Sequence, residues 1–175
     1  SLFIDKPGYG ASVIGYGDLN SDGYDDIVYA PSYQGDTRVG GTIKPRVMFF
    51  NPTKRTFEFD EQFQALLKEG RYPRRAVISD FDGDGRNDLF IGDTDEFQIV
   101  GGAQNQLYLQ TKDGWVSATN RLPQHIDYTH GVVPADFDLD GRMDLLVLNS
   151  IHSKSKYPEV TMRSYVLTFQ KDGTI

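Results

Sequence analysis

Three acidic segments of one pattern constrain this chain more than any other feature. Each reads Asp-x-Asp/Asn-x-Asp-Gly-x-x-Asp, and the three begin at Asp18, Asp80 and Asp136. Apolar runs of the length of β-strands precede and follow each segment. The pattern therefore predicts one structural unit that occurs three times.

The unit contains up to four predicted strands. In the first repeat these cover 11–17, 27–30, 46–50 and 56–59. The second repeat has the same succession, and the sequence of the third ends where its fourth strand would begin. Four short antiparallel strands in about 60 residues are typical of a propeller blade. The one predicted helix covers 60–69 and is capped by Gly70.

We therefore predict an all-β fold, a β-propeller of four-stranded antiparallel blades, with about three blades in this chain. The expected blades cover about 9–70, 71–125 and 126–175, and the last lacks its fourth strand. Because propellers typically have four to eight blades, we expect an incomplete ring whose remaining blades come from the same or another chain. The alternative is a β-sandwich built from similar hairpins.

The acidic loops have the donor pattern of a site for calcium. Side chains at positions 1, 3, 5 and 9 offer oxygen ligands, position 7 offers its backbone carbonyl, and Gly at position 6 permits the sharp turn. About three Ca²⁺ ions are expected. The predicted ligands are Asp18, Asn20, Asp22, Tyr24 and Asp26; Asp80, Asp82, Asp84, Arg86 and Asp88; and Asp136, Asp138, Asp140, Arg142 and Asp144.

Other interpretations of these loops are weaker. An EF-hand needs a bidentate Glu at position 12, where this chain has Tyr29, Ile91 and Val147, and it needs a helix after the loop. Magnesium usually keeps several waters and seldom uses an all-protein cage. An Asp-rich turn that binds nothing is the remaining alternative, since Asp and Gly are ordinary turn residues.

The first loop and its following strand, residues 17–31, resemble the FG-GAP repeat of integrin α-subunit propellers. Residues 80–85 and 136–141 are more similar to the bacterial VCBS variant of that repeat. The resemblance implies a Ca²⁺-binding propeller, secreted or at the cell surface. Such propellers occur in adhesins, lectins, toxin subunits and some enzymes, so the resemblance leaves the function open.

Composition excludes several classes of function. The chain has no cysteine, which rules out disulfides and Cys-based metal sites. Its formal charge of −7 argues against nucleic acid as a partner. No apolar run is long enough to span a membrane as a helix.

In an up-and-down blade, the acidic loops and the longer connections lie at opposite ends. Binding residues usually lie in variable loops on a rigid scaffold. We therefore expect a protein or glycan ligand on the rim opposite the calcium loops. The candidate ligand-binding residues are Tyr33, Arg38, Arg74, Arg75, Tyr128, His130 and Tyr157.

Two functions remain open from the sequence. The favoured one is a non-catalytic, calcium-stabilised extracellular module for cell adhesion or carbohydrate or protein binding, because no nucleophile–base pair and no His-x-x-x-His spacing occurs. The alternative is a propeller domain of a larger secreted enzyme, such as a polysaccharide lyase.

Overall fold

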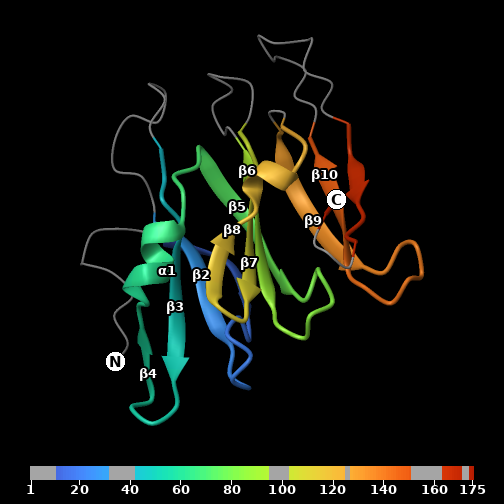
Figure 1. Cartoon of the computed structure of the whole chain (residues 1–175). Helices are drawn as coiled ribbons and strands as arrows, with labels where there is room; N and C mark the ends of the chain where they lie inside the picture. The colour runs from blue at the N-terminus through green and yellow to red at the C-terminus, as the bar shows by residue number, and fades with distance from the viewer. Residues whose placement is uncertain (1–10, 32–41, 95–102, 125–126, 151–162, 171–173) are drawn as a thin grey trace.

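The computed structural model describes residues 11–31, 42–94, 103–124, 127–150, 163–170 and 174–175, which form three antiparallel sheets arranged side by side (Figure 1). The all-β prediction and the blade-like, incomplete propeller are confirmed. No helix in the described part of the chain is long and apolar enough to cross a membrane.

Each sheet follows the order of the sequence. The first contains β1 (Ala11–Gly17), β2 (Asp26–Pro31), β3 (Arg46–Asn51) and β4 (Thr56–Glu58). The second contains β5 (Tyr72–Ser79), β6 (Asp88–Thr94), β7 (Gln106–Thr111) and β8 (Gly114–Ser117). The third contains β9 (Thr129–Ala135), β10 (Asp144–Asn149) and β11 (Tyr165–Leu167), and in it the described residues provide three strands.

The first strands of the three sheets are neighbours. β5 lies against both β1 and β9, as in the inner part of a propeller. A side chain at Gly15 would come within 2.7 Å of the Ala76 carbonyl oxygen, and one at Gly92 within 2.7 Å of Thr129 Cγ2. Glycine at these positions therefore permits the close approach of neighbouring sheets.

Two hydrophobic cores hold the sheets together. The first joins sheets one and two and includes Val28, Leu89 and Tyr108. The second joins sheets two and three, where Phe81 and Phe169 stack with ring centroids 4.9 Å apart. Apolar residues on facing sides of adjacent sheets are thus removed from water, which is the main force that holds the blades together.

A short helix covers the outer part of the first core. α1 runs from Glu61 to Leu66, with Asp60 as its N-cap. The sequence prediction of a helix up to residue 69 was too long, because Gly70 is bridged to Ile43 instead of capping the helix. The ring centroids of Phe63 on α1 and Trp115 on β8 are 4.5 Å apart, so this tryptophan packs within the fold.

Each inner strand contains one irregularity. The pairing with the second strand skips Ile14 in β1, Arg74 in β5 and His130 in β9. Each is the extra residue of a β-bulge, which interrupts the alternation of side chains between the two faces of the strand. The bulges of β5 and β9 lie toward the end of the strand away from the acidic loops, and that of β1 lies at the middle of the strand.

The two ends of the sheets carry different connections. The three acidic loops join β1 to β2, β5 to β6 and β9 to β10 at one end, together with the β3–β4 and β7–β8 turns (Figure 1). β2, β6 and β10 each begin at an acidic loop and run toward the opposite end of the sheet. The antiparallel order therefore places all three acidic loops on one rim.

Candidate metal centre

The first aspartate of each loop organises its turn. Asp80 Oδ1 accepts hydrogen bonds from the backbone of Gly83 and Asp84, and its Oδ2 accepts from Gly85, at 2.8 to 3.1 Å. Gly85 has a φ of +88°, a conformation that favours glycine. The equivalent bonds run to Asp18 from Asp22 and Gly23, and to Asp136 from Asp140 and Gly141.

The last aspartate of each loop is fully buried and joins three parts of its blade. Asp88 begins β6, accepts from Phe81 at 2.9 Å with Oδ2, and accepts from Gln110 of β7 at 2.9 Å with Oδ1. Asp26 makes the same pair of bonds with Leu19 and Phe50, and Asp144 with Phe137 and Phe169. In the first two blades this residue therefore ties the loop to the third strand, and in the third blade it ties the loop to Phe169, just past the end of β11.

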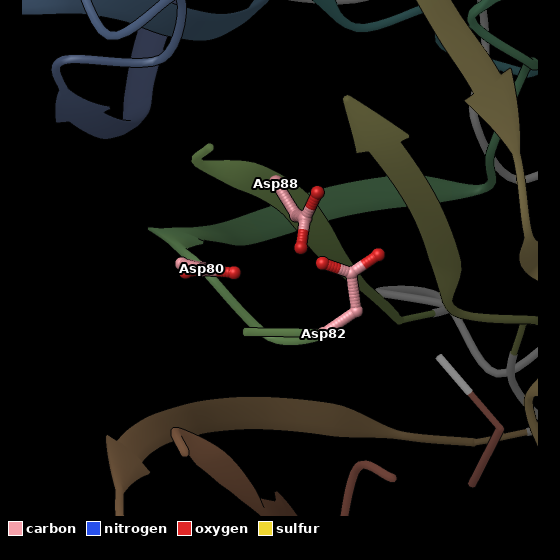
Figure 2. A group of neighbouring side chains, drawn as sticks. All are labelled: Asp80, Asp82 and Asp88. Carbon is pink, nitrogen blue, oxygen red and sulfur yellow. The ribbon is translucent and has the colours of Figure 1, made fainter. Parts of the chain in front are cut away.

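Carboxylates converge in the second and third loops. Ligand oxygens of Asp80, Asp82 and Asp88 lie within 4.8 Å of one another, and Figure 2 shows the three side chains around one space. Asp136, Asp138 and Asp144 form the equivalent group. Such all-oxygen donor sets fit a hard divalent cation, so both groups could hold a metal ion.

The first loop differs at its third position. Asn20 stands where the other loops have Asp82 and Asp138. Its Nδ2 donates to Asp22 Oδ2 at 3.0 Å, and its Oδ1 accepts from the Asp22 backbone at 3.1 Å. The first loop thus keeps an oxygen donor at this position and carries one carboxylate fewer among its predicted ligand side chains.

The electrostatics of the second loop disfavour three ionised carboxylates without a cation. Burial raises the pKa of Asp88 to about 7, with Asp82 and Asp80 adding to the rise and the bonds from Gln110 and Phe81 opposing it. The pKa of Asp82 is raised by burial and by Asp80. A bound cation would favour the ionised form of all three.

Comparison with protein families matches the FG-GAP-like repeat to residues 18–91 and again to 80–147. The chain belongs to the FG-GAP repeat family. Both matches begin at the first aspartate of an acidic loop and extend past the last aspartate of the next one. Neither a search of curated proteins nor a search of solved structures found a match.

In two FG-GAP loops of this chain, an arginine side chain contacts the acidic site. The sequence predicted a role for the backbone carbonyl of this residue but none for its side chain. Arg86 Nη2 pairs with Asp84 Oδ2, and Arg86 Nε donates to the Gln110 carbonyl at 3.2 Å. Arg142 repeats both contacts with Asp140 and Phe169. Asp84 and Asp140, predicted as ligands, are thus held partly by a cationic side chain of the protein. Because Arg stands at position 7 in both loops, the sequence did contain a pattern from which this side-chain contact could have been predicted.

The first FG-GAP loop has an aromatic residue at that position. Tyr24 packs on Phe50, with ring centroids 5.6 Å apart. The backbone carbonyls of Tyr24, Arg86 and Arg142 were the expected seventh-position ligands, and that assignment stays a prediction. The side chains at this position connect the first two loops to β3 and β7, and the third loop to Phe169, which follows β11.

The predicted ligand-binding residues separate into three groups. Tyr33, Arg38 and Tyr157 lie outside the described residues. Tyr128 is buried and stacks on His130, with ring centroids 5.7 Å apart. Arg74 and Arg75 line a cavity between the first two blades.

Proposed function

We propose that this chain is a calcium-stabilised binding module of the FG-GAP propeller type that acts outside the cell, in adhesion or in glycan or protein recognition. The observation that carries the proposal is the convergence of Asp80, Asp82 and Asp88, repeated at Asp136, Asp138 and Asp144. Carboxylates this close repel one another unless a cation or protons neutralise them.

Calcium is the favoured ion. The donors are all oxygen, and the loops contain neither the cysteine nor the histidine that would favour zinc or copper. In each loop the ion would be held by side chains at positions 1, 3 and 9. It would neutralise the loop at the point where two strands meet, so its role is structural.

The extracellular location is supported by this dependence on calcium. Extracellular modules bind Ca²⁺ with dissociation constants of about 10⁻⁴ to 10⁻³ M, which suits an environment rich in the ion. The rim opposite the loops is left for recognition, because the acidic loops occupy the other end of every sheet. Binding residues on connections above a rigid scaffold are a common arrangement.

Further blades would complete the ring by packing on the third sheet. Three apolar side chains on one face of that sheet remain in contact with water: Val133 is 43% exposed, Leu148 38% and Val166 43%. Their counterparts in the second sheet, such as Val77 and Leu107, are packed against sheet three. We propose that another blade, from the same or another chain, covers this face.

The test of the proposed function is calcium binding coupled to stability. Titration calorimetry of the metal-free protein should show Ca²⁺ binding at about three sites, and thermal melting should rise with Ca²⁺ and fall again with EDTA. Mg²⁺ at the same concentration should stabilise less. A melting temperature unchanged by both Ca²⁺ and EDTA would refute the calcium role.

A further inference from the structure

A cavity of about 240 Å³ lies between the first two blades, at the end away from the acidic loops. The beginning of β1, the end of β2 and the beginning of β5 form its sides. Its apolar lining includes the buried residues Ile14, Ala30 and Ile43, and Tyr72 adds a half-buried aromatic ring. Arg74 and Arg75 supply its positive charge.

The β5 bulge explains why two consecutive arginines reach one cavity. In a regular strand, successive side chains point to opposite faces. Pro73 pairs with Asp93 and Arg75 with Gly92, so Arg74 is the extra residue. A bulge re-aims side chains in this way and is common next to binding sites. The lining of the cavity by both Arg74 and Arg75 agrees with that geometry.

These two guanidinium groups are not neutralised by the described part of the chain. Neither makes an ion pair with a described carboxylate, and Arg75 Nη1 donates to the Arg74 carbonyl oxygen at 3.5 Å. None of the described residues that line the cavity is acidic. In a chain of net charge −7, the cavity is therefore a local site of positive charge.

We propose that this cavity binds the carboxylate of a hexuronate unit in an acidic glycan. Guanidinium groups bind carboxylates through paired, charge-assisted hydrogen bonds. The aliphatic and aromatic walls would contact the C–H face of the sugar ring. This inference rests on the proposed function, because it specifies which class of ligand binds at the rim opposite the acidic loops.

The size of the cavity supports a small, compact group. At about 240 Å³ it lies below the roughly 300–1,000 Å³ of pockets for drug-sized ligands. The cavity is thus large enough for one sugar ring, and the rest of the glycan would lie outside it. A neutral sugar would leave both arginines without a partner, so the carboxylate should determine specificity.

The test is titration calorimetry of the Ca²⁺-loaded protein with oligogalacturonate, and with neutral oligogalactose of equal length as the comparison. We expect binding of the acidic oligomer alone, weakened by added salt. Arg74→Gln and Arg75→Gln should each weaken it at least about tenfold. Lys112→Gln removes one positive charge in the β7–β8 turn, at the other end, and should leave binding unchanged.

The outcomes separate this inference from the proposed function. If Ca²⁺ raises the melting temperature but oligogalacturonate does not bind, or binds Arg74→Gln and Lys112→Gln equally, the hexuronate site is wrong and the calcium-stabilised module stands. If a poly-Glu peptide binds at these arginines as tightly as oligogalacturonate or more tightly, the ligand of the cavity is an acidic peptide and not an acidic glycan. Loss of the calcium effect would instead overturn the proposed function.

Discussion

The side chain of Asn87 donates a 2.6 Å hydrogen bond to the backbone carbonyl of Asp18, and so joins the second acidic loop to the first. The Asn87 backbone also donates to Ser21 Oγ at 3.3 Å. Adjacent loops are therefore in contact across the boundary between blades. This contact lets the loops stabilise the packing of the blades as well as their own turns.

Replacing Asn87 with Ala should destabilise the fold by about 1 kcal/mol, because the Asp18 carbonyl loses its side-chain partner. Urea unfolding of the Ca²⁺-loaded protein measures the change. Asn120→Ala is the matched control, since Asn120 is exposed and should change stability by less than about 0.5 kcal/mol. Equal effects of the two substitutions would show that the loop-to-loop bond adds nothing.

Asp82→Asn should have opposite effects with and without calcium. In EDTA it removes a charge next to Asp80 and should leave the melting temperature unchanged or raise it. With Ca²⁺ it should reduce the calcium-dependent gain, which is about 2.7 kcal/mol for one site at 100 times its dissociation constant. Differential scanning calorimetry under both conditions measures this.

The control for that experiment is Asp113→Asn, which removes an exposed carboxylate in the β7–β8 turn. It should keep the full calcium-dependent gain. If Asp82→Asn responds to Ca²⁺ as strongly as this control does, Asp82 is not a ligand.

Gly15→Ala should destabilise the protein by roughly 1–3 kcal/mol, as expected for overpacking. The new methyl group would lie 2.7 Å from the Ala76 carbonyl oxygen and 2.8 Å from its Cβ, so β1 and β5 would have to separate. Gly131 follows a bulge in the same way, but a methyl group there would find its nearest neighbour at 3.4 Å. Gly131→Ala should therefore be tolerated, and equal losses in urea unfolding would contradict the close approach of the blades.

Asp93 should make stability depend on pH. Burial raises the pKa of its carboxyl to about 7, although the backbone N–H groups of Tyr72, Thr94 and Arg71 oppose the rise. Between pH 4 and pH 7 the folded state then binds a proton that the unfolded chain has lost. Its stabilising contribution is complete below about pH 4 and declines as the pH rises toward 7.

The measurement is urea unfolding across pH 4 to 7 for the parent and for Asp93→Asn, both in EDTA. Asp93→Asn cannot titrate at this position, so its stability should fall less steeply than that of the parent over this range. The difference should be of the order of a few kcal/mol. Parallel curves would mean that the three backbone donors hold Asp93 ionised.

The blades and their acidic loops could be predicted because their signals are local. Asp18, Asp80 and Asp136 stand at one position of a repeat, and the apolar runs beside them have strand periodicity. The fourth strands, at Thr56–Glu58 and Gly114–Ser117, were also found from β-forming residues after a turn.

Other parts of the site depend on contacts between distant residues. The bond of Asp88 to Gln110 requires the pairing of β6 with β7, and sequence spacing does not contain it. The bulge at Arg74 depends on how β5 pairs with β6 and packs between its neighbours, so alternation would place Arg74 and Arg75 on opposite faces. Tyr128 was predicted as a rim residue because it lies in an expected link between blades, but it is buried.

The separation of charge along the strands has a consequence for how this protein meets a ligand. Twelve of its 25 acidic residues belong to the three loops at one end, whereas at the other end Arg74 and Arg75 make no ion pair with a described acid. A polyanion approaching in water would be turned away from the first end and drawn toward the second. Long before any contact forms, the field would select the orientation of the encounter, and this selection would weaken as ionic strength rises.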